Sequence, residues 1–264
     1  MTDRGLSESA VLVARTLSND TGSLETDDLV VCEVPVALSF NSVSYAVMMA
    51  TPADLEDFIR GFAIGEGIVS TPSAIYDIEI TQAANGIDVN ASVSNETAYK
   101  LKDRRRSMAG PSGCGLCGIE SIEQLRRDVK PVTPDRGDRL VPSEKALNRA
   151  LAGLRPLQDV SRKTGGAHAA AWCSADGDIL ALREDVGRHN ALDKILGWRA
   201  RTPAEGFVLV SSRASFEMVS KAATAGVTVL VAVSAPTSAA VDTAKQAGLC
   251  LIAFATEGRS ARYA

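Results

Sequence analysis

The chain has 264 residues and 45% of them are hydrophobic, so it can bury one large core or two smaller ones. Its formal net charge of −4 at pH 7 argues against general binding to nucleic acids or membrane surfaces, which favours an excess of basic residues. The sequence contains no apolar run near the roughly 20 residues that cross a bilayer, and its start has no secretory signal pattern, so we expect a cytoplasmic protein.

The N-terminal half is predicted to be a small α+β domain over residues 26–130, after a flexible leader over 1–25. Thr51, Pro52 and Asp54 have the order of a helix cap, a first helical residue and a capping-box partner, so a helix is expected to begin there. The remaining elements are two strands around a turn at 40–42, a hairpin over 75–93 with a turn at Asn85-Gly86, and a basic helix over 96–107.

The C-terminal half, residues 140–264, has a more regular pattern. A helix is expected over 143–162, followed by a hairpin with a turn at Asp176-Gly177. Strands and helices then alternate, with strands over 207–211, 227–234 and 249–255 and helices over 216–225 and 238–247. Apolar strands separated by helices predict a parallel sheet covered on both faces, and therefore an α/β fold.

A glycine-rich segment, A-G-P-S-G-C-G-L-C-G at 109–118, carries Cys114 and Cys117 in a C-x-x-C arrangement. Its four glycines and proline predict a loop, and a helix is expected behind it. The positive end of a helix lowers the pKa of a nearby thiol, and the thiolate is the nucleophile in sulfur chemistry. The pair is therefore a candidate for thiol chemistry.

A C-x-x-C pair can also supply two of the four ligands of a zinc site, and the pattern alone does not decide between thiol chemistry and metal binding. Cys32, Cys173 and Cys250 occur singly in apolar strands, where buried inert thiols are expected. Zinc deaminases combine H-x-E with P-C-x-x-C, but His168 is followed by two alanines and lies after the cysteine pair. That chemistry is disfavoured. His189 is equally consistent with a structural role.

Three segments at predicted strand ends, 211–215, 234–238 and 254–259, carry anion-binding residues. Open parallel sheets bind ligands beyond the carboxyl ends of their strands. Arg213 and Arg259 are suited to bidentate contact with phosphate, and helix N-termini add N–H groups. The serines in these segments also fit ordinary helix caps.

Five ordered motifs together resemble the FdhD family, the formate dehydrogenase accessory sulfurtransferases. They are G-C-G-L-C-G, T-G-G-A-H-A-A-A, R-E-D-V-G-R-H-N-A-L-D-K, S-S-R-A-S-F-E-M-V-S-K-A and V-A-V-S-A-P-T-S-A-A-V. The resemblance covers nearly the whole chain from about residue 30.

The resemblance implies that sulfur passes from a cysteine desulfurase, as a persulfide, to the Mo-bis(molybdopterin guanine dinucleotide) cofactor that formate dehydrogenase needs. It implies a homodimer that also meets the apo-enzyme, contains no permanent metal, and has a cytidine-deaminase-like α/β/α sandwich in its second half. Cys114 would carry the persulfide with Cys117 as its partner. The cofactor-binding stretch would be Phe254, Ala255, Thr256, Glu257, Gly258 and Arg259, of which the last two match the family better than the middle.

Two alternatives remain. One is a zinc-dependent, deaminase-like hydrolase, which stoichiometric zinc in the purified protein would favour. The other is a non-catalytic chaperone that binds the cofactor and presents it to the apo-enzyme, and that would tolerate loss of both cysteines of the pair.

Overall fold

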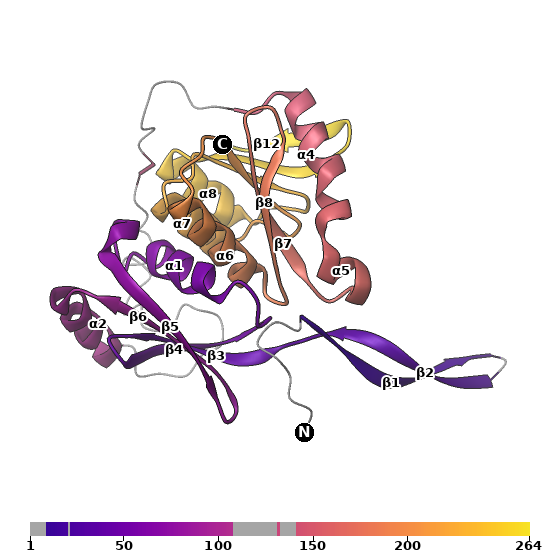
Figure 1. Ribbon diagram of the computed structural model, residues 1–264. Helices are drawn as coiled ribbons and strands as arrows, with labels where there is room; N and C mark the ends of the chain where they lie inside the picture. Colours follow the sequence, from indigo (N-terminus) through magenta and orange to yellow (C-terminus); the bar gives the residue numbers. More distant parts are fainter. Residues whose placement is uncertain (1–8, 21, 108–130, 133–140) are drawn as a thin grey trace.

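The structure is a computed structural model that describes residues 9–20, 22–107, 131–132 and 141–264. In these residues a projecting two-stranded hairpin, a four-stranded sheet and a six-stranded sheet follow one another along the chain (Figure 1). None of the described helices is both long and apolar enough to cross a membrane.

The hairpin consists of β1 (Ala10–Asn19) and β2 (Gly22–Val31), paired in antiparallel register. It extends away from the body of the molecule (Figure 1). The expectation of a flexible leader over 1–25 is therefore wrong for the described residues from Ala10 onward. The pattern concealed the strands because polar residues, such as the consecutive Arg15 and Thr16, occupy both faces, so no apolar alternation marks a buried side.

The four-stranded sheet has the strand order β4-β3-β6-β5 and packs one face against α1. Its elements are β3 (Val34–Phe40), β4 (Val43–Ala50), α1 (Leu55–Gly65), the 3-10 turn η1 (Pro72–Ala74), β5 (Ile75–Ala83), β6 (Gly86–Val93) and α2 (Asn95–Ser107). The predicted turn between the first two strands is confirmed. Asn41 and Ser42 have φ values of 49° and 63°, as a tight hairpin turn of the primed type requires.

The predicted start of α1 is wrong by several residues. The helix begins at Leu55, and Asp54 takes the N-cap position in a left-handed conformation without a side-chain cap. Thr51 does not cap this helix because its polar groups bond to the other half of the chain: its hydroxyl accepts from Val186 N at 3.2 Å. A long-range contact thus displaces a local one.

The six-stranded sheet has the order β12-β11-β10-β9-β7-β8. Its strands are β7 (His168–Cys173), β8 (Ile179–Asp185), β9 (Phe207–Val210), β10 (Val229–Ala232), β11 (Cys250–Thr256) and β12 (Arg259–Arg262). The expected parallel sheet is confirmed for β9, β10 and β11. The outer strands run antiparallel to their neighbours, and β12 was not predicted.

Helices cover both faces of this sheet. They are α4 (Glu144–Leu157) and α5 (Asp159–Thr164), followed by α6 (Arg188–Arg201), α7 (Phe216–Thr224) and α8 (Ser238–Ala247). Val208 and Val210 face α6, α7 and α8, whereas Phe207 and Leu209 face α4, as the two-residue period of a strand requires. α6 was not predicted.

The helix expected over 143–162 is divided into α4 and α5 at Gln158. The carboxylate of Glu184, on β8, accepts hydrogen bonds from Val160 N and Ser161 N, both at 2.8 Å. It thereby supplies the acceptor that the first turn of α5 needs. This cap comes from a residue more than twenty positions away, so the local pattern did not reveal the break.

Candidate functional site

The carboxyl ends of the three parallel strands form one edge of the six-stranded sheet. Main-chain hydrogen bonds connect neighbouring strand ends: Ser234 N donates to Ser212 O at 3.3 Å, and Phe254 N donates to Ser234 O at 3.1 Å. His168, the first residue of β7, lies at the same edge because β7 runs antiparallel to β9. The edge thus brings together residues from widely separated parts of the sequence.

α6 begins at this edge, and Asp185 fixes its position. This last residue of β8 accepts hydrogen bonds through Oδ1 from Gly187 N and from Asn190 Nδ2, both at 2.9 Å. The carboxylate therefore holds the sharp turn between the strand and the helix. As a result Arg188 and His189, the first two residues of α6, are fixed at the carboxyl edge.

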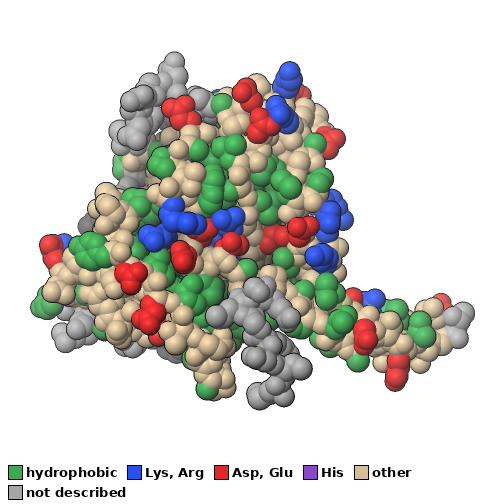
Figure 2. All heavy atoms as spheres, viewed as in Figure 1, with side chains coloured by type: hydrophobic (Ala, Val, Ile, Leu, Met, Phe, Trp, Pro, Cys, Tyr) green, Lys and Arg blue, Asp and Glu red, His purple; other side chains and the backbone are tan. Residues whose placement is uncertain are grey.

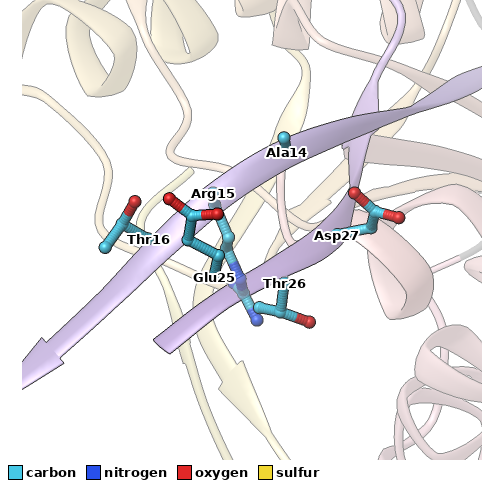
Figure 3. A pocket seen from close by; sticks show the side chains of 6 residues that line it. All are labelled: Ala14, Arg15, Thr16, Glu25, Thr26 and Asp27. Carbon is cyan, nitrogen blue, oxygen red and sulfur yellow. The ribbon is translucent and has the colours of Figure 1, made fainter. Parts of the chain in front are cut away.

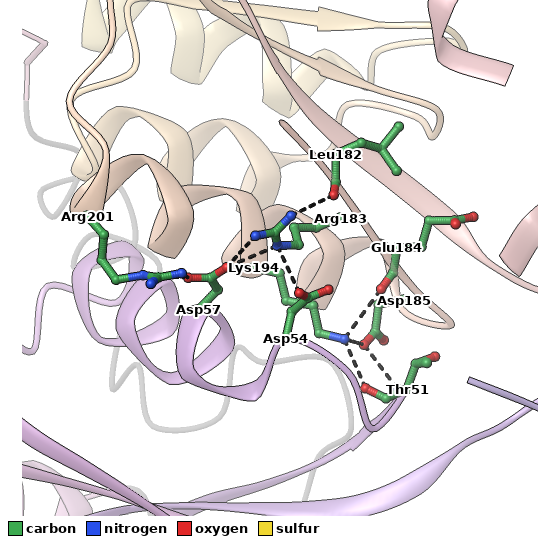
Figure 4. Close-up of polar contacts among 9 residues, drawn as sticks. All are labelled: Thr51, Asp54, Asp57, Leu182, Arg183, Glu184, Asp185, Lys194 and Arg201. Atoms are coloured by element: carbon green, nitrogen blue, oxygen red, sulfur yellow. Dashed lines mark hydrogen bonds and ion pairs between the residues drawn. The ribbon is translucent and has the colours of Figure 1, made fainter. Parts of the chain in front are cut away.

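The same carboxylate connects the site to the N-terminal half (Figure 4). Asp185 Oδ2 accepts from Thr51 N at 3.0 Å and lies 2.6 Å from Lys194 Nζ, and both charged side chains are completely buried. Lys194 Nζ also donates to Thr51 O at 2.9 Å, and Asn190 Nδ2 donates to Met49 O at 2.9 Å. Buried charges persist only when paired and hydrogen-bonded, so the start of α6 is firmly anchored to the segment between β4 and α1.

Further charged pairs join the two halves. Asp57 on α1 is almost fully buried and accepts from Arg183 Nη2 at 2.8 Å and from Arg201 Nη2 at 2.6 Å. Lys221 Nζ on α7 lies 2.8 Å from Glu66 Oε1, just after α1, and 2.9 Å from Asp193 Oδ2 on α6. Burial, opposed by that ammonium, raises the pKa of Asp193 to about 6. Basic and acidic side chains are mixed on the surface along this junction (Figure 2).

Sequence reasoning missed the role of this network. The relevant pattern is a stripe of polar or small residues, Asn190, Asp193, Lys194 and Gly197, spaced i, i+3, i+4, i+7 along α6. The same helix buries apolar residues on its other sides. Such a stripe within an otherwise apolar helix indicates a buried polar contact with a neighbouring element, here α1.

Ionisable side chains gather around Arg188 at the carboxyl edge. Burial and the charge of Arg188 lower the pKa of His189 to about 4, and the same two causes lower the pKa of His168. Both imidazoles are therefore neutral near pH 7. His189 Nε2 lies 3.8 Å from Glu217 Oε2, which accepts from Ser215 Oγ at 2.7 Å.

Two of the predicted cofactor-binding residues lie at this edge. Arg213 is exposed immediately after β9. Phe254 is 44% exposed and has a φ of 50°, at a register shift where β11 bends. The side chain of Ala255, in contrast, is completely buried in the core beneath α4, so only its main chain is available to a ligand.

The rest of the predicted stretch is not a loop beyond the last strand. Thr256 ends β11, Glu257 and Gly258 form a turn, and Arg259 begins β12. Gly258 N donates to Asn148 Oδ1 on α4 at 2.8 Å. This turn therefore contacts α4 and lies on the face of the sheet that α4 covers, whereas α6 and α7 cover the opposite face.

The cysteine pair Cys114 and Cys117 lies outside the described residues. The other three cysteines, Cys32, Cys173 and Cys250, are buried, as predicted. Burial raises the pKa of Cys173 to about 12, which keeps this thiol protonated at neutral pH. Within the described ranges, no group of three or more His, Cys, Asp and Glu side chains is placed to hold a metal ion.

A hollow on the projecting hairpin lies apart from the carboxyl edge (Figure 3). It is lined by Ala14, Arg15, Thr16, Glu25, Thr26 and Asp27. Arg15 is already paired with Asp28, and none of the predicted site residues contributes to the lining. The hollow therefore adds nothing to the candidate site.

Comparisons with known proteins agree on one family. The FdhD/NarQ family matches residues 31–264 of this chain. A protein of Cupriavidus necator named "Sulfur carrier protein FdhD" is 50% identical over 240 residues, which cover 90% of this chain and 82% of that protein. Proteins with the same name from Bordetella petrii and Chromobacterium violaceum are each 46% identical over 256 residues, covering 95% and 96% of this chain and 90% and 93% of theirs.

The fold also has a solved counterpart. A crystal structure from Desulfotalea psychrophila, of a protein described as a formate dehydrogenase accessory protein, superimposes with a TM-score of 0.76 over 97% of each chain. Its sequence is 23% identical, so this likeness concerns the fold alone. Taken with the match over residues 31–264 and the relatives at 46–50% identity, these findings show that the chain belongs to the FdhD/NarQ family.

Proposed function

We propose that the chain is a sulfurtransferase that accepts persulfide sulfur from a cysteine desulfurase on Cys114 and passes it to Mo-bis(molybdopterin guanine dinucleotide), as formate dehydrogenase requires. The observation that carries the proposal is the 46–50% identity to three proteins named as sulfur carriers, over at least 90% of this chain. The accessory protein that shares the fold supports formate dehydrogenase as the client enzyme.

The described cysteines support the C-x-x-C pair by elimination, and the family resemblance assigns the persulfide to Cys114 within that pair. Cys32 is 5% exposed, and Cys173 and Cys250 are completely buried, so none of the three presents its sulfur to a donor protein. Only the C-x-x-C pair remains among the five cysteines of the sequence. Cys117 acts as the partner of Cys114 in this proposal.

The loading step is a thiol exchange. The thiolate of Cys114 attacks the outer sulfur of the desulfurase persulfide, a new S–S bond forms, and the desulfurase thiolate leaves. The thiolate of Cys117 then attacks the sulfur of Cys114, which forms a Cys114–Cys117 disulfide and releases the outer sulfur as sulfide, so the cysteine pair supplies the two electrons. The released sulfide would become the terminal sulfido ligand of the client molybdenum. The proposal places this reaction in the cytoplasm.

Mass spectrometry after incubation with a cysteine desulfurase and cysteine tests the proposal. We expect a gain of one sulfur atom on the peptide that contains Cys114, and no gain in a Cys114→Ser variant. Sulfur found only on Cys32, Cys173 or Cys250 would exclude the assignment. A folded protein without both thiols of the pair that still activates formate dehydrogenase would favour the chaperone alternative.

The client is proposed to bind at the carboxyl edge of a cytidine-deaminase-like domain without a resident metal. The support is the row of strand ends that holds Arg213 and Phe254, with Arg259 on the adjacent hairpin. Because charge-assisted hydrogen bonds contribute roughly 1.5–3 kcal/mol, Arg259→Ala should weaken guanine-nucleotide binding about tenfold or more. Unchanged affinity by calorimetry would move the site away from this hairpin.

The protein is proposed to act as a homodimer, so sulfur could pass within one chain or between two. Cys114→Ser should bind cofactor but not sulfurate it, whereas Arg259→Ala should accept sulfur but not transfer it. Restored activity in confirmed mixed dimers would show transfer between chains. If Cys114→Ser abolished cofactor binding in a folded protein, the separation of the two sites would be wrong.

A further inference from the structure

The N-terminus of α6 reaches the carboxyl edge without a side-chain cap. Its N-cap residue is Gly187, which has no side chain to accept hydrogen bonds from the first turn. α8 differs, because Thr237 Oγ1 caps it by accepting from Ala240 N at 3.2 Å. Among the described residues, therefore, no capping side chain accepts a hydrogen bond from the N–H groups in the first turn of α6.

Arg188, the first residue of this helix, is a half-buried cation without a described anionic partner. Its Nε is buried and makes no hydrogen bond, and none of the described carboxylates forms an ion pair with its guanidinium. Arginines removed from water are normally paired. The carboxylate of Glu217 interacts electrostatically with Arg188 without an ion pair, and it accepts hydrogen bonds from Ser215 Oγ and from its own main-chain N–H.

Two histidines from different elements lie within the electrostatic reach of Arg188. His189 follows it on α6, and His168 begins β7. His189 Nε2 is also buried without a hydrogen-bond partner in the described part of the chain. Neutral imidazoles donate a hydrogen bond without adding charge, so they complement an arginine around a bulky anion. Arg213, exposed at the end of β9, adds a second cation at this edge.

We propose that Arg188, His189 and His168 form an anion subsite that binds a phosphate or diphosphate group at the uncapped start of α6. Oxygen-rich anions suit this place because the guanidinium provides paired donors and the helix end provides N–H groups. That the anion belongs to the molybdenum cofactor's dinucleotide rests on the proposed function. The subsite is distinct from the Arg259 hairpin, which leans on the α4 face.

The two histidines give a direct readout, because they are the only ones in the chain. Pyrophosphate is titrated into full-length, nitrogen-15-labelled protein, and the two imidazole signals are followed by nuclear magnetic resonance. Both signals should shift along one saturable curve. Imidazole signals that do not move at saturating pyrophosphate would overturn the proposal.

Calorimetry with pyrophosphate tests whether Arg188 is the cation that binds the anion. Arg188→Gln should weaken pyrophosphate binding about tenfold or more, and Arg188→Lys, which keeps the charge but loses the paired donors, should weaken it less. Arg155→Gln on exposed α4 is the matched control for net charge and should leave affinity unchanged. Equal losses in the Arg155 and Arg188 variants, or no loss in either, would overturn the subsite.

Thermal unfolding first establishes that each variant is folded. If Arg188→Gln does not fold, Arg188→Lys and His189→Gln serve in its place, and unchanged affinity in both would overturn the subsite. The persulfide assay on Cys114 is separate. If Cys114 gains no sulfur, the proposed sulfur transfer is refuted but the anion subsite is unaffected. If pyrophosphate does not bind, the anion subsite is refuted but the proposed sulfur transfer is unaffected.

Discussion

Gly61 on α1 and Gly197 on α6 lie where the two helices cross, each directly against the main chain of the other helix. A Cβ on Gly61 would lie 1.7 Å from Asp193 O, and a Cβ on Gly197 would lie 1.9 Å from Asp57 O. The two helices therefore approach more closely than any side chain would permit. This crossing fixes the N-terminal half against the helix that presents Arg188 and His189.

Gly197→Ala should destabilise the protein by about 1–3 kcal/mol or more, because a main-chain clash cannot be relieved by a change of rotamer. Urea unfolding measures the effect. Gly153→Ala on α4 is the control, since its Cβ would meet only the tip of Ile179 at 3.3 Å and alanine is the better helix former. Equal unfolding midpoints for the two variants would show that the crossing is more tolerant than the geometry implies.

Lys194→Met should cost roughly 3–5 kcal/mol, because it leaves the buried carboxylate of Asp185 without its cation. Chemical denaturation measures the loss. The comparison is Lys100→Met, which removes a salt bridge to Glu96 whose side chains are 73% and 77% exposed, and which should leave the unfolding midpoint nearly unchanged because water screens the pair. Similar losses in both variants would contradict a structural role for the buried pair.

Stability should fall as the pH is lowered from about 6.5 to about 4, in part because of His189. Burial and Arg188 lower the pKa of its imidazole from 6.5 to about 4 in the folded protein. The unfolded chain therefore binds a proton in this window that the folded protein does not, which favours unfolding by up to about 3 kcal/mol.

His189→Gln should consequently lose less stability than the unaltered protein between pH 7 and pH 4.5. Denaturation curves at several pH values measure this difference in slope. His168 has a lowered pKa as well and acts in the same direction, so the variant should keep part of the dependence. Parallel pH profiles would mean that His189 titrates normally.

Cys173 should resist alkylation in the native protein. Burial raises the pKa of its thiol to about 12, so almost no thiolate is present at pH 8. Peptide mapping after brief treatment with iodoacetamide should find Cys173 modified only when denaturant is added. Cys173→Ala should cost on the order of 1 kcal/mol or less and should leave sulfur loading intact. Rapid modification of Cys173 under native conditions would contradict its assignment as a packing residue.

Much of the fold was predictable because its determinants are local. The turns at Asn41-Ser42, Asn85-Gly86 and Asp176-Gly177 depend on residues that tolerate unusual backbone angles, and all three connect strands as expected. The alternation of β9, α7, β10, α8 and β11 follows from apolar periodicity. β12 and the β1–β2 hairpin lack that periodicity, because exposed strands bury no continuous apolar face.

By itself the sequence determined the strands and helices with clear apolar periodicity, the helices on both faces of the parallel strands and the family resemblance, since periodicity and motifs are properties of neighbouring residues. Only the tertiary structure decided what the R-E-D-V-G-R-H-N-A-L-D-K motif does. Thr51 and Asp185 are 134 positions apart, yet their hydrogen bond joins the segment before α1 to the residue that holds the start of α6. Asn190 and Lys194 become structural anchors because burial forces each polar group to find a partner, whereas Arg188 and His189 are left facing the carboxyl edge. Which polar residues hold the fold and which remain for a ligand depends on these distant contacts, and no local pattern encodes them.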